Sequence, residues 1–389
     1  MEKLNIRALM PVLFGFFVMG FCDIVGISSD YAASAFGWSS TMAGLVPSAV
    51  FVWFFFLGVP TGILMNKIGR KQTVLLSCLV TVIGMALPLI SYTSQTTLAA
   101  YALLGIGNAI LQVSLNPLLQ NVITSDKMLT PSLTAGQVIK AVSSFAGPFI
   151  VIIAVRWMGG GDEQKWYLSF PIMGAITLLS GLWLLFTPIP QEARSQKTVR
   201  IADIFALLRH PAILILFFGI FFAVGTDVST NFISSKIMIS RYGYTKDMAG
   251  IAPQVYFVLR TAGAFAGMFL LSHISERKYL QYSIVSCIVA VLSLAFVHDA
   301  AANFVCIGAI GFCCSCVFPI VYGMAIKAMP GKGNEISGLM IMAVAGGTVS
   351  FLVGAASDIC GIVGGIAVIL AEVLYLAFCA FSKSTKSNK

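Results

Sequence analysis

Several ionisable side chains lie inside long apolar stretches of this 389-residue chain, among them Asp23, Asp227, Lys140 and Arg260. A charge surrounded by apolar groups is costly, so such a side chain usually faces a partner or a water-filled cavity. A carboxyl in that setting can bind and release a proton, whereas a cation can pair with it or bind a ligand. The residue types therefore predict ion movement and ligand binding rather than covalent catalysis.

Asp23 is the first candidate for a proton-binding carboxyl, because it falls near the middle of the first apolar stretch. Removal from water favours the neutral form of a carboxyl, which can then exchange its proton near neutral pH. The alternative is a structural acid held by a cation of another helix. Lys140 lies deep in the fifth stretch and is a hypothetical partner for Asp23, with snorkelling as its other interpretation. Asp30 shares the helix face of Asp23 and is expected at the outer mouth of a cavity.

Amide side chains form a stripe along the fourth stretch, where Asn108, Gln112, Asn116 and Gln120 recur at every fourth residue. This spacing keeps all of them on one helix face. Amides both donate and accept hydrogen bonds, as the binding of a polyhydroxylated ligand requires. Bonding between helices is the alternative role, but a stripe of this length favours the lining of a polar cavity.

The second half of the chain carries two pairs of polar residues at helical spacing. Asp227 and Asn231 are four residues apart, as are Tyr256 and Arg260, so each pair shares a helix face. Arg260 could brace Asp227 or bind ligand hydroxyls, and the sequence leaves both roles open. Lys236, nearer the outer end, is expected to reach the headgroups. The aromatic residues that offer a stacking face to a sugar ring, each also an ordinary packing residue, are Trp53, Tyr256, Phe257 and Tyr322.

Membrane-spanning helices must position these side chains. The chain is 58% hydrophobic and 10% charged, against about 25% charged in soluble domains. A spanning helix needs about 20 mainly apolar residues. Hydrophobicity surrounds each stretch instead of alternating along it, which favours helices over a barrel. The predicted spans are twelve: 8–36, 40–66, 72–92, 96–122, 131–155, 166–187, 211–241, 245–274, 279–298, 301–328, 334–358 and 360–382.

The distribution of basic residues predicts the orientation of these spans. With both termini inside, 17 of the 24 Lys and Arg residues fall on the cytoplasmic side, 4 on the outer side and 3 within spans. This is the positive-inside bias of membrane proteins. Although the net charge is +9, no basic run is interleaved with aromatic residues, which argues against a nucleic-acid partner. The lipid bilayer is the predicted surrounding.

The chain divides into two similar halves, residues 1–187 and 211–389, joined by a polar cytoplasmic linker at 188–210. Acids at mid-span, Asp23 and Asp227, occupy corresponding positions in the first span of each half. Basic turns follow the second span of each half, and Pro117 and Pro319 interrupt the fourth. Such repeats point to a substrate site between the halves that opens alternately to either side.

Short motifs make a family resemblance specific. The turn at 62–71 resembles the loop signature of the major facilitator superfamily, although Asn66 stands where an acid is usual. Almost the whole chain resembles the fucose–galactose–glucose proton symporter family of L-fucose permease-like sugar transporters, through the stretches 60–67, 112–117, 260–263, 318–322 and 346–358. The resemblance implies an all-α membrane protein with twelve transmembrane helices in two pseudo-symmetric six-helix bundles.

The same resemblance implies roles for individual residues. Asp23 matches an aspartate that exchanges protons, Gln137 matches a glutamine that contacts sugar, and Arg260 matches an arginine of the same helix. Gln112 takes the place of a glutamate that takes part in proton coupling. Because an amide cannot titrate, a relay through position 112 is broken, and Asp23 would act alone or with Asp227. Lys140 is a candidate for the charge that the missing glutamate leaves vacant.

These observations predict a bacterial inner-membrane transporter that imports a hexose or 6-deoxyhexose, such as glucose, galactose or fucose, with a proton. The predicted substrate ligands are Asn108, Gln112, Asn116, Gln137, Lys140, Asn231, Tyr256, Arg260 and Tyr322, and the coupling residues are Asp23 and Asp227. No catalytic set, nucleotide-binding loop or metal-ligand spacing is present in the sequence, which argues against an enzyme, a cofactor and a metal site. A monomer is expected. An uncoupled facilitator, a proton-coupled exporter, sodium as the coupling ion and a sugar sensor remain open.

Overall fold

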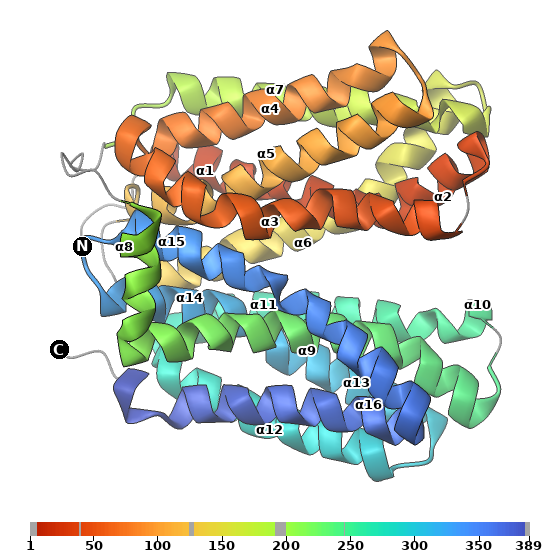
Figure 1. The fold of residues 1–389 in the computed structure, drawn as a ribbon, viewed down its shortest axis with the longest axis vertical. Coiled ribbons are helices and arrows are strands. Elements are labelled where there is room, and N and C mark those ends of the chain that lie inside the picture. Colours follow the sequence, from red (N-terminus) through yellow and green to blue (C-terminus); the bar gives the residue numbers. More distant parts are fainter. Residues whose placement is uncertain (1–5, 39, 124–127, 191–199, 245, 386–389) are drawn as a thin grey trace. The chain divides into compact units, whose positions relative to one another are not determined.

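Helices form the regular structure of this protein. The computed structural model describes residues 6–38, 40–123, 128–190, 200–244 and 246–385, and no strand occurs in those ranges. Figure 1 labels the helices along the chain. The prediction of an all-α chain is confirmed.

The first span is α1 (Ile6–Met19), the short 3₁₀ helix η1 (Gly20–Ile24) and α2 (Val25–Phe36). The helices α3 (Ser40–Ile68), α4 (Arg70–Ile90) and α5 (Ser94–Gln120) follow. A capping box begins α5, because the Thr93 hydroxyl accepts from the Thr96 N–H and the Thr96 hydroxyl accepts from the Thr93 N–H. The remaining elements of this half are α6 (Leu129–Ile153), the π-helical turn η3 (Ala154–Met158), η4 (Glu163–Leu168) and α7 (Ser169–Phe186).

The predicted polar linker contains two short helices, α8 (Ile201–Phe205) and η5 (Ala206–Arg209), which the hydrophobic pattern does not reveal. The second half begins at α9 (Pro211–Tyr242), whose first residue is a proline, as is common at a helix start. It continues through α10 (Lys246–Ala249), α11 (Ile251–His273), α12 (Glu276–Phe296), α13 (Ala300–Cys314), α14 (Val317–Ala328), α15 (Gly333–Met342), η6 (Ala343–Val349), α16 (Ser350–Phe381) and η7 (Lys383–Thr385).

The label α16 joins two helices across a sharp bend at Gly361, whose φ of 67° is readily adopted by glycine. Its first part continues the span that α15 and η6 begin. Ten helices in the described residues are long and apolar enough to cross a membrane, and Ile6–Cys22 and Val52–Ile68 are shorter apolar helices. Each of these twelve segments overlaps one of the twelve predicted spans. The breaks at η1, η3 and η6 inside three of them were not predicted.

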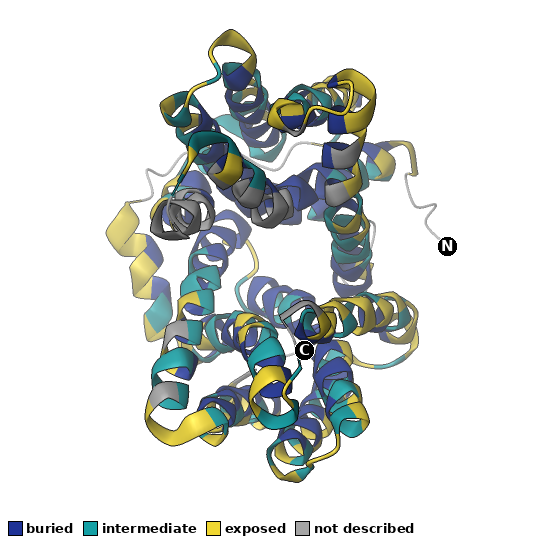
Figure 2. Ribbon diagram, turned by 90° about the vertical axis from the view of Figure 1, so that its right-hand side faces the viewer, coloured by how far each residue is buried: buried dark blue, intermediate teal, exposed yellow. Residues whose placement is uncertain are grey.

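Many large apolar residues of these helices are exposed, as lipid solvation requires, and Figure 2 colours the exposed residues yellow. Phe56, Phe145 and Phe296 are 59, 72 and 76% exposed. The core of each half instead holds small residues and aromatics such as Tyr101 and Tyr256, both with no exposed surface. This distribution agrees with a protein whose surrounding is hydrocarbon.

The chain forms two compact units. The first consists of residues 1–129, 136–204 and 333–342, and the second of 130–135, 205–332 and 343–389. The helix α15 groups with the first unit because it packs closely on α3, where a Cβ at Gly338 would lie 2.5 Å from the Gly58 carbonyl oxygen. The domain boundaries at 187 and 211 stay a prediction.

Candidate functional site

A charged cluster in the second unit joins α9 to α11. Arg260 Nη2 lies 2.9 Å from Asp227 Oδ2, and the side chains are 37 and 22% exposed. The Tyr256 hydroxyl donates to Asp227 Oδ1. Tyr256 and Arg260 are one turn apart on α11, so both reach the same carboxylate, and Tyr256 itself is fully buried. Of the two roles left open for Arg260, the structure shows the brace.

This cluster borders a cavity of about 290 Å³, lined by Asp227, Val228, Asn231, Phe232 and Phe257. Asn231 follows Asp227 by one helical turn, which places an amide beside the carboxylate. Phe232 and Phe257 are 41 and 48% exposed. Carboxylate and amide groups bind hydroxyls, and aromatic faces cover the apolar face of a ring. The cavity therefore has the chemistry that a sugar requires.

Lys236 contributes positive charge near this cavity. Its Nζ lies 4.1 Å from the centre of the Phe232 ring, a cation–π contact. In this conformation the ammonium group of Lys236 lies over the ring of a cavity residue, and its extension to the headgroups stays a prediction.

The amides of α5 form one stripe, but they bond to protein. Asn108 Nδ2 donates to the Met19 carbonyl at 2.9 Å, and Gln112 Nε2 donates to Asn108 Oδ1 at 2.9 Å. Asn116 Nδ2 donates to the Gln112 carbonyl at 3.0 Å. The three side chains are at most 8% exposed. In this conformation the stripe joins α5 to α1 instead of lining an open cavity, and its contact with substrate stays a prediction.

The side chains of Asp23 and Asp30 lie outside the described residues, so only their helices can be placed. Asp23 belongs to η1, and α6 crosses this element closely: a Cβ at Gly20 would lie 2.6 Å from the Lys140 carbonyl oxygen. Lys140 and Gln137, one turn apart on α6, are both half-buried. The backbone thus brings Lys140 near Asp23, as the pairing hypothesis requires, and the roles of these residues stay predictions.

Tyr322 lies apart from the cavity. It is 1% exposed on α14, and its ring stacks on Phe318 with centroids 5.9 Å apart. Trp53, on α3, is half-buried. In this conformation Tyr322 is buried while Phe257 is open to a ligand, and the contact of Tyr322 with substrate stays a prediction.

A polar cluster at the ends of α3, α4 and α15 explains the unusual Asn66. Asn66 Nδ2 donates to Glu335 Oε1 at 2.8 Å, and Asn334 Nδ2 donates to Asn66 Oδ1 at 2.7 Å. Arg70 Nε donates to Asn334 Oδ1 at 2.8 Å, and its Nη1 to Asn121 Oδ1 at 2.6 Å. A carboxylate, that of Glu335 on α15, thus lies against the amide at position 66. Sequence spacing could not show this pairing.

Glu372 was missed although it lies within the last apolar stretch. It is 1% exposed on α16, and Ser229 Oγ of α9 donates to its Oε1 at 3.2 Å. The signal was available, because an acid inside an apolar span marks a functional site by default.

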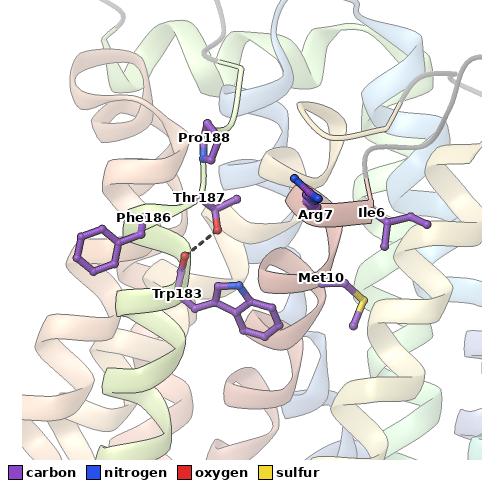
Figure 3. A pocket seen from close by; sticks show the side chains of 7 residues that line it. All are labelled: Ile6, Arg7, Met10, Trp183, Phe186, Thr187 and Pro188. Carbon is purple, nitrogen blue, oxygen red and sulfur yellow. Dashed lines mark hydrogen bonds between the residues drawn. The ribbon is translucent and has the colours of Figure 1, made fainter.

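A larger cavity, of about 450 Å³, lies between the start of α1 and the end of α7. Its lining combines Arg7 with apolar side chains such as Met10, Trp183 and Phe186 (Figure 3). Thr187 Oγ1 donates to the Trp183 carbonyl at 2.7 Å. Because the cavity lies at span ends and lacks carboxylate and amide side chains, we place the candidate site at Asp227.

Comparisons with known proteins identify related membrane transporters. The family model described as Major Facilitator Superfamily matches residues 11–365. A "Glucose/galactose transporter" of Brucella abortus biovar 1 (strain 9-941) is 24% identical over 374 residues, covering 91% of this chain and 89% of that protein. A "Putative glucose/galactose transporter" of Helicobacter pylori (strain ATCC 700392 / 26695) is 25% identical over 365 residues, covering 88 and 87%.

Solved structures show the same fold. A crystal structure of the E. coli fucose:proton symporter FucP matches with a TM-score of 0.84 at 17% identity, covering 97% of this chain and 98% of that one. The human organic anion transporter MFSD10 matches with a TM-score of 0.78 at 15% identity, covering 97 and 100%. The predicted fold of twelve helices in two six-helix bundles is confirmed.

Proposed function

This chain belongs to the Major Facilitator Superfamily, and on that premise we propose that it imports a monosaccharide together with a proton by alternating access. Multi-pass helices and transporter relatives support the general class. The observation that carries the sugar assignment is the cavity beside Asp227, where a braced carboxylate, an amide and two exposed aromatic rings meet.

The cavity suits a neutral ring with many hydroxyls. The Asp227 carboxylate accepts hydrogen bonds, Asn231 both donates and accepts, and Arg260 donates. Phe257 offers an exposed ring against which a sugar can stack. Because Arg260 already balances the charge of Asp227, the bound ligand need not bring a charge of its own. We therefore propose a hexose, glucose or galactose, in agreement with the names of the relatives, or a 6-deoxyhexose such as fucose.

We assign proton coupling to Asp23 and Asp227, with Lys140 near the first and Arg260 on the second. Asn108, Gln112, Asn116 and Gln137 then contact the sugar in another state of the cycle. The proposal places the protein as a monomer in a bacterial inner membrane with both termini in the cytoplasm, where the positive-inside bias puts them.

An uncoupled facilitator is the second candidate, and one observation favours it. Gln112 Nε2 donates to Asn108 Oδ1 at 2.9 Å, so a neutral hydrogen bond stands where a titrating group is expected by resemblance. A proton-coupled exporter of drugs or metabolites is the third. An exporter of apolar compounds would be served by an apolar cavity, whereas this one holds Asp227 and Asn231.

Uptake into proteoliposomes tests the proposal. Labelled D-galactose, D-glucose and L-fucose are offered separately, with and without an inward proton gradient. Accumulation above the outside concentration that depends on the gradient supports symport, equilibration alone supports the facilitator, and no movement of any of these sugars refutes the sugar assignment. Asp227→Asn should abolish accumulation. Asp203→Asn is the matched control, because Asp203 pairs with Arg200 at 3.6 Å outside the spans, with the side chains 49 and 80% exposed.

A further inference from the structure

Glu372 is a carboxyl inside the membrane that the proposed mechanism does not use. It lies about halfway along the span Ile359–Phe381 and is 1% exposed. The described residues contain three ion pairs, Arg200–Asp203, Arg260–Asp227 and Lys327–Glu276, and Glu372 belongs to none of them. Isolated buried carboxylates are strongly disfavoured, and they become neutral by binding a proton.

The hydrogen bonds of Glu372 fit a neutral acid. Ser229 Oγ of α9 donates to Oε1 at 3.2 Å. Oε2 is buried and has no hydrogen-bond partner among the described residues. A buried carboxylate without a cation is poorly compensated for its loss of water, and binding a proton removes its charge.

The described ionisable groups of the elements around Glu372 either contact other groups or are exposed. The 3₁₀ helix η6 carries no ionisable residue. On α9, α12 and α16 the described contacts are Asp227 to Arg260, Lys236 to the Phe232 ring, Arg241 to the Leu294 carbonyl, Glu276 to Lys327, Arg277 to the Ser382 carbonyl, Tyr279 to Cys316, Cys287 to Cys314 and Tyr375 to the Ile215 carbonyl. Tyr242 accepts from Asn303, and Cys379 lies against Gly219. Lys278, Tyr282 and Cys360 are exposed, and the side chain of Asp358 lies outside the described residues.

Glu372 also lies at the junction of α9 with η6. A Cβ at Gly225 of α9 would lie 3.0 Å from Glu372 Oε1 and 3.4 Å from the Gly346 carbonyl of η6. Gly346 in turn approaches the α9 backbone so closely that its Cβ would lie 1.9 Å from the Phe221 carbonyl oxygen. Short 3₁₀ segments inside a helix often mark a hinge, and the compact units divide between Met342 and Ala343, where η6 begins.

We propose that Glu372 is a proton-binding site of this transporter, occupied while α9 packs on η6 and emptied to water when these elements separate. One proton leaves Oε2 for water and is later taken up from water, and no other bond is made or broken. The two carboxyls lie at different faces of α9. Asp227 faces α11, whereas Ser229 faces α16 and bonds to Glu372 there. The inference rests on the proposed function, because α9 and η6 separate only if the protein passes through a transport cycle.

Infrared spectroscopy of the purified protein in lipid tests this site without requiring transport. Labelling all glutamates with ¹³C separates their acid carbonyl band from that of the aspartates. We expect a band of protonated glutamate at neutral pH, lost in Glu372→Gln and retained in Glu335→Gln. Glu335 is the matched control, because it is also buried, at 9% exposure, and bonded to Asn66. Saturating D-galactose should change the intensity of the band.

Three results would overturn the site: no protonated glutamate band, a band that survives Glu372→Gln, or a band that changes neither with pH nor with D-galactose. Retained helical circular dichroism and a monodisperse elution profile verify folding of the variant. If Glu372→Gln does not fold, Gly225→Ala serves instead, because its methyl group lies against Oε1 and should shift the frequency of the band. A band that titrates in a protein that moves no sugar would leave the site standing while the proposed substrate fails.

Discussion

The polar residues of the two units differ in kind. On α5, in the first unit, three buried amides bond to one another and to the Met19 carbonyl, without a formal charge. On α9, in the second unit, a carboxylate pairs with a guanidinium and borders an open cavity. The difference shows that halves with similar sequence patterns can carry different polar groups, neutral amides in one and an ion pair in the other. We infer that the amide stripe of α5 supplies neutral hydrogen bonds and that the cluster of α9 and α11 supplies charge.

The largest effect is expected from removing the charge balance of the second unit. Arg260→Met leaves the Asp227 carboxylate without its cation, and we expect affinity for D-galactose to fall roughly ten- to hundredfold, because hydrogen bonds to charged groups contribute about 1.5–3 kcal/mol. Isothermal titration calorimetry of the variant in detergent measures this affinity. Adding Asp227→Asn removes the unpaired charge, so the double variant should lose less than the sum of the single variants. Strict additivity would contradict the pairing.

A second prediction concerns a variant whose amide stripe in the first unit gains a carboxyl, a group that the cluster of the second unit already has. Gln112→Glu introduces a titratable group into the amide stripe, next to Asn108 Oδ1. An ionised carboxylate would face that oxygen, so the protonated form, which can donate to it, is favoured. We expect sugar uptake by the variant to become more strongly dependent on an imposed proton gradient, by several-fold. Gln120→Glu, two turns away and half-buried, is the control. Equal gradient dependence in both variants would show that position 112 has no special role.

The cavity beside Asp227 can be tested through its aromatic wall. Phe257→Ala removes a ring that is 48% exposed at the cavity. We expect sugar affinity to fall about three- to tenfold, since aromatic contacts contribute about 0.5–1.5 kcal/mol beyond their buried area. Val258→Ala is a matched control, because Val258 is 60% exposed on the same helix and does not line the cavity. A loss shared equally by both variants would place the sugar elsewhere.

The smallest effect is expected at Lys140. Its backbone packs against Gly20, near Asp23. If its ammonium group balances Asp23, Lys140→Met should shift the pH profile of uptake while changing sugar affinity less than threefold. Equilibrium binding and uptake at several pH values separate the two effects. An unchanged pH profile with unchanged uptake would rule out the pairing.

The sequence predicted the spans because hydrophobic length depends only on local composition. It also placed Asp227 beside Asn231 and Tyr256 beside Arg260, since spacing of four residues fixes a helix face. It could not show that Tyr256 and Arg260 meet the same carboxylate, or that Glu335 replaces the acid absent at Asn66, because those contacts join distant helices. The break at η6 was hidden for a similar reason: its cause is backbone contact of Gly346 with α9. Glu372 was visible in the sequence and was overlooked.

The cluster of Asn66, Asn334, Glu335 and Arg70 has a mechanical consequence. It joins α15 to α3 and α4 by polar contacts, beside a seam at which the backbones of Gly58 and Gly338 approach closely. Water can replace such bonds one for one, at a net cost of about 0.5–1.5 kcal/mol for each. We infer that hydrogen bonds of this kind can break and form again many times at a small cost in free energy, as repeated transport cycles require.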